Sequence, residues 1–86
     1  WYPIKIRPPV ERLHRRLVAT GIRKILLAEF SPWPEDTAFR LNGCGMVVIN
    51  PPWKLGETLH SLLPALLEVL RQHPAGRATT SWLVAE

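Results

Sequence analysis

Four consecutive residues, Asn50-Pro51-Pro52-Trp53, carry groups that could hold a planar base bearing an amine. The amide oxygen of Asn50 can accept a hydrogen bond from an exocyclic amine, and the prolines hold a turn open so that carbonyl groups face that amine. The indole of Trp53 can stack on a base turned out of its helix. In the structural alternative, which we favour, Pro51-Pro52 ends a strand and Trp53 packs under the next helix.

The elements on either side of this tetrad would position it. The apolar run Met46-Val47-Val48-Ile49 precedes it and predicts a buried strand over residues 46–49. Leucines at helical spacing follow it and predict an amphipathic helix over residues 55–70, with Pro64 inside. The tetrad would therefore join the end of a buried strand to the start of a helix.

The rest of the chain alternates in the same way. Strands are predicted over residues 1–6, 22–30 and 78–85, and a helix is predicted between Pro9 and Gly21. Residues 31–41 are predicted to form a loop, Asn42-Gly43 is a turn signal, and Gly43-Cys44-Gly45 is interpreted as the hairpin turn. The order strand-helix-strand-strand-helix-strand predicts an α/β fold with one layered sheet. The two middle strands would form an antiparallel hairpin, and at least one sheet edge would be open.

Length and composition limit the class of protein. The 86 residues make at most one domain, and 47% of them are apolar, which excludes a disordered chain. No apolar run approaches the roughly 20 residues that span a bilayer. The single cysteine, Cys44, excludes an internal disulfide and fits the reducing cytoplasm. The three histidines and Cys44 lack metal-ligand spacing, so no metal site is expected.

The basic residues are concentrated near the start of the chain. Up to Lys24 there are seven bases and one acid, whereas the remainder carries more acids than bases. Such a stripe is typical of proteins that meet phosphates, and Arg12, Arg15 and Arg16 could contact RNA. The alternative is a helix face that is simply solvated.

The tetrad resembles the (Asp/Asn)-Pro-Pro-(aromatic) motif of methyltransferases that modify adenine N6 or cytosine N4. A wider likeness extends over essentially the whole chain and identifies it with the RlmJ family, some of whose members are also described as proteins for catabolism of external DNA. The segments that carry it are Trp1-Tyr2-Pro3-Ile4, Gly21-Ile22-Arg23-Lys24-Ile25-Leu26, Gly45-Met46-Val47-Val48-Ile49-Asn50-Pro51-Pro52-Trp53-Lys54-Leu55, Leu63-Pro64 and Ser81-Trp82-Leu83-Val84-Ala85-Glu86. The longest of these blocks, Gly45 to Leu55, is specific.

The resemblance implies an S-adenosylmethionine-dependent enzyme that N6-methylates an adenine in 23S ribosomal RNA. Residues 1–86 would be the C-terminal portion of a single Rossmann-like class I methyltransferase domain, with no internal boundary. Residues 1–6 would be its fifth strand, and the hairpin would supply the sixth and seventh. The cofactor loop and the catalytic Asp-Pro-Pro-Tyr would lie upstream of Trp1, because this chain has no glycine-rich loop that opens a helix.

On this mapping no residue of the chain is catalytic, binds the cofactor or binds a metal. The partners would be 23S ribosomal RNA and the remainder of the domain, with no membrane. Trp1-Tyr2-Pro3 would sit at the strand end facing the catalytic side, where the aromatic rings could stack on a base or pack in the core. The tetrad could shape the target-base side of the cleft, and the chain alone would be inactive. The alternative is a stand-alone basic α/β module that binds nucleic acid or protein without catalysis.

Overall fold

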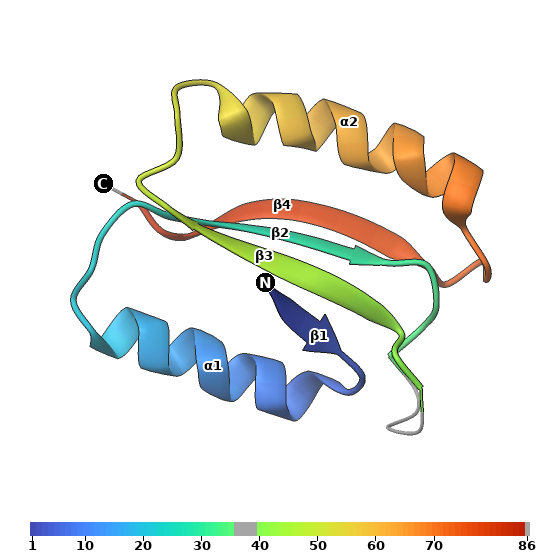
Figure 1. Cartoon of the computed structure of the whole chain (residues 1–86), viewed down its shortest axis with the longest axis horizontal. Coiled ribbons are helices and arrows are strands. Elements are labelled where there is room, and N and C mark those ends of the chain that lie inside the picture. Colours follow the sequence, from blue (N-terminus) through green and yellow to red (C-terminus); the bar gives the residue numbers. More distant parts are fainter. Residues whose placement is uncertain (36–39, 86) are drawn as a thin grey trace.

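The computed structural model describes residues 1–35 and 40–85 and contains the six elements in the predicted order (Figure 1). They are β1 (Tyr2–Ile4), α1 (Arg7–Ala19), β2 (Ile25–Ser31), β3 (Gly43–Ile49), α2 (Leu55–Leu70) and β4 (Arg77–Val84). Pro8 and Pro9 lie in the first turn of α1, and Gly21 follows its end with a φ of +78°. Both signals act as the sequence predicts.

The four strands form one sheet in the order β1-β3-β2-β4, and each hydrogen-bonded pair is antiparallel. This confirms the α/β class and the hairpin of β2 with β3. It follows from the pairing that β1 runs parallel to β2, with β3 between them, and that β3 runs parallel to β4, with β2 between them. Each helix therefore connects two parallel strands and crosses over one antiparallel strand.

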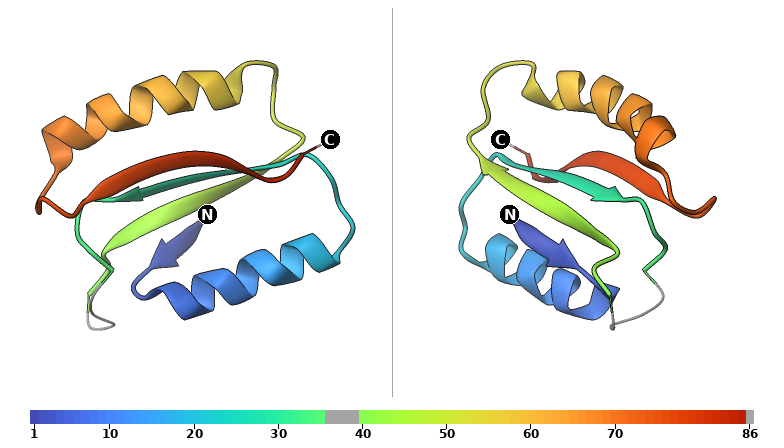
Figure 2. Two further views of the ribbon diagram at one scale, coloured as in Figure 1. Left: turned by 180° about the vertical axis from the view of Figure 1, so that it is seen from behind. Right: turned by 45° about the vertical axis from the view of Figure 1, so that its right-hand side comes forward.

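The two helices cover opposite faces of the sheet (Figure 2). Side chains alternate along β2, so that Leu26 faces the start of α2, where a Cβ on Gly56 would lie 3.6 Å from Leu26 Cδ1. Glu29 lies three residues further along β2, so its side chain points to the opposite face, where it accepts a hydrogen bond from Arg7 of α1. The buried core on the α1 face is a cluster of Tyr2, Ile4 and Val10. Of the described helices, neither is long and apolar enough to cross a membrane.

The hairpin turn differs from its prediction. Gly43, Cys44 and Gly45 belong to β3. All three pair with β1, and Cys44 and Gly45 also pair with β2, so the interpretation of Gly43-Cys44-Gly45 as a turn is wrong. The reason is packing: a Cβ on Gly43 would lie 2.4 Å from the carbonyl oxygen of Phe30. The glycines admit close neighbours rather than bend the chain. Of the predicted loop, residues 36–39 lie outside the described part.

Candidate functional site

The tetrad borders a groove of about 780 Å³ at one end of the sheet. Pro51, Pro52 and Trp53 form one side of the groove, together with the first turns of α2. Leu26 of β2 and Trp82 of β4 line it as well. In Figure 1 the segment between β3 and α2 passes near the C-terminal end of β4, and the lining of the groove includes residues from both segments.

Two indoles line this groove and remain in contact with solvent. Trp53 is 87% exposed and Trp82 is 49% exposed. The expectation that Trp53 packs under the following helix is therefore wrong, because no side chain so exposed is part of a core. Pro51 is buried and β3 ends at Ile49, so the proline pair does terminate the strand.

Cationic side chains accompany the indoles. Lys24 and Lys54 line the groove, and the Lys54 Nζ lies 4.5 Å from the centroid of the Trp53 ring. Among the described lining residues, Glu57 is the one acid. His60 supplies a further polar group. The combination of aromatic faces and lysines suits a planar group attached to an anion.

The backbone around the groove has an unusual conformation. Lys24, Asn50 and Lys54 have φ values of 59°, 53° and 68°, in the left-handed region that residues other than glycine seldom adopt. Hydrogen bonds hold it in place: the Asn50 N–H donates to the Lys24 carbonyl at 2.9 Å, and the Thr58 N–H donates to the Lys54 carbonyl at 3.0 Å. Such strain persists where the surroundings fix the local geometry, and these hydrogen bonds contribute to fixing it beside the groove.

Asn50 itself is exposed and does not line the groove. It follows the carboxyl end of β3, which is antiparallel to β1 and β2. The tetrad therefore lies at the end of the sheet where β1 and β2 begin. Ligand sites of open α/β sheets form at the opposite end, beyond the carboxyl ends of the parallel strands.

The other predicted site residues lie apart from the groove. Trp1 is 68% exposed, and Tyr2 is buried, with its ring in the core, at the start of β1 rather than at its carboxyl end. Pro3 is exposed, opposite Cys44. The arginines predicted to contact RNA are exposed on α1, on the face of the sheet opposite to α2. They are Arg12, Arg15 and Arg16. The structure does not bring these residues together with the tetrad, and their contact with substrate stays a prediction.

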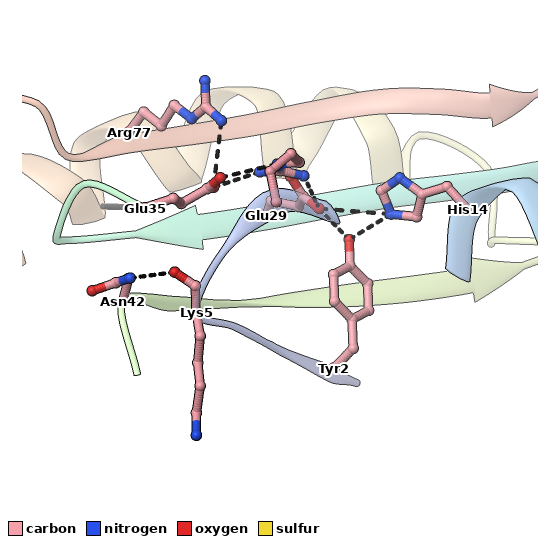
Figure 3. Close-up of polar contacts among 8 residues, drawn as sticks. Tyr2, Lys5, His14, Glu29, Glu35, Asn42 and Arg77 are labelled. Carbon is pink, nitrogen blue, oxygen red and sulfur yellow. Dashed lines mark hydrogen bonds and ion pairs between the residues drawn. The ribbon is translucent and has the colours of Figure 1, made fainter. Parts of the chain in front are cut away.

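A second cluster of polar residues lies under α1 (Figure 3). Arg7 donates to Glu29 Oε1 at 3.0 Å and, through its Nε, to Glu35 Oε2 at 2.9 Å. Tyr2 donates its hydroxyl proton to Glu29 and lies 3.1 Å from the His14 Nε2. Arg77 reaches Glu35 Oε1 at 3.3 Å. These contacts tie the start of α1 to β2, to the segment after β2 and to β4.

The electrostatics of this cluster have identifiable causes. Burial acts to raise the pKa of Glu35, but hydrogen bonds and charge from Arg7, and then Arg77, outweigh it and hold that pKa below its usual value. Burial lowers the pKa of His14; the charge of Glu29 opposes that shift, and the charge of Arg7 adds to it. Burial, followed by the bond to Glu29, raises the pKa of the Tyr2 hydroxyl. The cluster therefore favours ionised Glu35, neutral His14 and protonated Tyr2.

Neither Glu29 nor Glu35 is among the residues singled out from the sequence. The available signal is Glu29 itself, a carboxylate within the apolar strand Ile25–Ser31, which must be paired if it is buried. Its partners come from Arg7 and Tyr2, 22 and 27 residues away, so they could not be identified without the fold. In the described residues no three His, Cys, Asp or Glu side chains could together hold a metal ion.

Comparison with known proteins gives two kinds of match. A family model described as Ribosomal RNA large subunit methyltransferase D, RlmJ, matches residues 1–84. Ribosomal RNA large subunit methyltransferase J of Escherichia coli (strain K12) is 43% identical over 86 residues, and that of Haemophilus influenzae (strain ATCC 51907 / DSM 11121 / KW20 / Rd) is 40% identical over 86 residues. Both alignments include 100% of this chain but 31% of the relative, so the chain spans about a third of their length.

Proposed function

The chain belongs to the RlmJ family of ribosomal RNA large subunit methyltransferases, and we propose that the intact protein N6-methylates an adenine of 23S ribosomal RNA, with S-adenosylmethionine as methyl donor. The observation that carries the proposal is the family match over residues 1–84, together with 40–43% identity to two such methyltransferases. A stand-alone binding module is the weaker alternative, because both relatives are about three times as long as this chain.

The strand order supports the further proposal that residues 1–86 are the C-terminal portion of a Rossmann-like domain. If β1 is the fifth strand, then β2 and β3 are the sixth and seventh. On that mapping the seventh strand, β3, lies between the fifth and the sixth and runs antiparallel to both. Among the described residues β1 pairs with β3 alone, so its other edge can accept a strand from upstream.

The described residues do not fit the role of a cofactor cradle. S-adenosylmethionine would need a glycine-rich loop that opens a helix, whereas α1 begins at Arg7 with Pro8 and Pro9 in its first turn. Gly43 and Gly45 lie inside β3, and the space above Gly45 is filled by Tyr2. We therefore assign no step of methyl transfer to this chain and place the cofactor site and the catalytic tetrad in the upstream part.

The chain's contribution would be structural support at the carboxyl end of β1. Arg7 follows that strand and is held by Glu29 and Glu35. Asn42 is buried at the same end and bonds to the carbonyl oxygen of Lys5 (Figure 3). These contacts fix the backbone next to the place where the strand carrying the catalytic tetrad would lie. The partners in this proposal are 23S ribosomal RNA and the rest of the domain, in the cytoplasm.

A methyl-transfer assay with the intact protein tests the proposal. Unmodified 23S ribosomal RNA is incubated with the protein and isotope-labelled S-adenosylmethionine, and the digested nucleosides are analysed by mass spectrometry. The expected product is labelled N6-methyladenosine, and residues 1–86 alone should produce none. Label in another nucleoside, or transfer by residues 1–86 alone, would contradict the proposal.

A further inference from the structure

We propose that the groove between Trp53 and Trp82 binds an unpaired nucleotide of the RNA substrate, with its base stacked on indole and its phosphate beside Lys54. The identification of that RNA as ribosomal rests on the proposed function. The nucleotide is not the methylated adenine, because the groove lies at the end of the sheet where β1 and β2 begin. It would be a second contact that holds the RNA in position.

The indoles carry the first part of the argument. Trp53 is 87% exposed and Trp82 is 49% exposed, although burying aromatic surface is one of the larger gains available to a fold. Trp82 pairs with Leu26 across the sheet, and both line the groove. Stacking on such faces binds any base, because each base has a planar π-surface. The volume of about 780 Å³ is within the roughly 300–1,000 Å³ typical of small-molecule sites.

Charge and polar groups select an anionic ligand. Lys24 and Lys54 both line the groove, against Glu57 as the one acid among its described lining residues. The Thr80 hydroxyl, also on the lining, is buried and makes no hydrogen bond within the described part of the chain. The left-handed backbone conformation of Lys24 and Lys54 sets the direction of the Cα–Cβ bond of each residue. An apolar peptide would offer no hydrogen-bond acceptor to Lys54 or to the Thr80 hydroxyl, whereas a nucleotide offers phosphate and sugar oxygens to them.

Binding of a short oligouridylate to the intact protein tests the site. Uracil lacks the adenine amine, so this probe does not report on the methylation site. We expect Trp53→Ala and Trp82→Ala each to weaken binding about 5- to 150-fold, the range given by loss of one base stack. Trp53→Phe should retain most of the affinity. Val69→Ala is the matched control, because Val69 is 79% exposed on α2 and does not line the groove.

Two charge variants make the test independent of the indoles. Lys54→Gly is compatible with the left-handed backbone, so the fold should persist. We expect it to weaken binding and to lower the slope of log affinity against log salt by about 0.7, the value for one phosphate contact on a single strand. Glu57→Gln should strengthen binding. Unchanged affinity in Trp53→Ala, Trp82→Ala and Lys54→Gly would overturn the proposal.

The groove could instead be filled by another part of the intact protein. Acrylamide quenching of wild-type and Trp53→Phe fluorescence separates the two cases. If acrylamide quenches the wild-type protein more than Trp53→Phe, the Trp53 indole is accessible to solvent. If Trp53 is shielded from acrylamide and Trp53→Ala binds oligouridylate as tightly as the wild type, the proposal is overturned. The proposed function fails separately: a wild-type protein that binds oligouridylate through the groove but methylates no ribosomal RNA would contradict methyl transfer and leave the groove assignment intact.

Discussion

The ring of Tyr2 occupies the space that a side chain on Gly45 would need. A Cβ atom on Gly45 would lie 2.1 Å from Tyr2 Cζ and 2.4 Å from the Tyr2 hydroxyl oxygen. The two residues are directly opposite each other in the antiparallel pair of β1 and β3. The glycine is therefore what allows the Tyr2 ring to lie across β3 and its hydroxyl to reach Glu29.

Replacement of Gly45 should destabilise the protein. Gly45→Ala forces the buried Tyr2 ring to move, and overpacking of this kind costs about 1–3 kcal/mol. The free energy of unfolding from urea titration of the intact protein measures the change. Gly56→Ala is the control, because its Cβ would make an ordinary 3.6 Å contact with Leu26 and would favour the helix by roughly 0.5–1 kcal/mol. Equal stability of the two variants would contradict this account.

Arg7 should contribute much more to stability than an exposed arginine does. Arg7→Gln leaves Glu29 and Glu35, with side chains 13% and 11% exposed, without their main cationic partner. Hydrogen bonds to charged groups contribute about 1.5–3 kcal/mol, and we expect a loss in that range. In Arg71→Gln the lost partner, Glu68, is 74% exposed, so the effect should stay below about 1 kcal/mol. Comparison of their urea midpoints checks the difference.

Acid should weaken the fold through Glu35 and His14. Both have a pKa in the folded protein below the usual values of 4.5 and 6.5, so the unfolded chain takes up protons first as pH falls. The contribution of each group to the free energy of unfolding is fully present above its usual pKa. It is lost as the pH falls through the pKa that the group has in the folded protein. The curve of unfolding free energy against pH should therefore decline below about pH 6.5, and again below about pH 4.5. Glu35→Gln should remove part of the second decline and leave the first, and a second decline of full size would contradict the role given to Glu35.

Asn50 should be dispensable for methyl transfer. It lies at the opposite end of the sheet from the carboxyl end of β1 and has a φ of 53°, which glycine adopts without strain. We expect Asn50→Gly to retain wild-type stability and kcat on ribosomal RNA, and Asn50→Ala to cost about 1 kcal/mol of stability with kcat unchanged. Steady-state kinetics of the intact protein decide this. A fall of about 100-fold in kcat in both variants would make Asn50 a catalytic residue.

The sequence is sufficient to predict the order of elements because local signals agree with one another. Pro8 and Pro9 open α1, Gly21 follows its end, and the valines of β3 precede a proline pair. The glycines of β3 mislead, since glycine usually marks a turn, and only the fold reveals that Tyr2 packs over Gly45. The start of β2 is also displaced, to Ile25, because Lys24 has a left-handed backbone that no sequence pattern indicates.

The candidate sites are less predictable because they depend on residues distant in sequence. The tetrad draws attention to residues 50–53, but the second wall of the groove comes from Trp82, which lies beside them through its pairing with Leu26. Arg7 is counted among the bases of the N-terminal stripe, yet it is held by Glu29 and Glu35 and braces the fold. The distribution of basic residues along the sequence does not distinguish a side chain that binds RNA from one that forms an ion pair inside the protein.

The coding sequence upstream of Trp1 tests the central claim most directly, namely that this chain completes a methyltransferase whose catalytic residues lie elsewhere. About 200 codons would include the rest of a typical one-domain α/β enzyme. The account predicts an open reading frame that encodes a glycine-rich loop opening a helix, followed by Asp-Pro-Pro-Tyr shortly before Trp1. A start codon immediately upstream of Trp1, with neither motif, would contradict it.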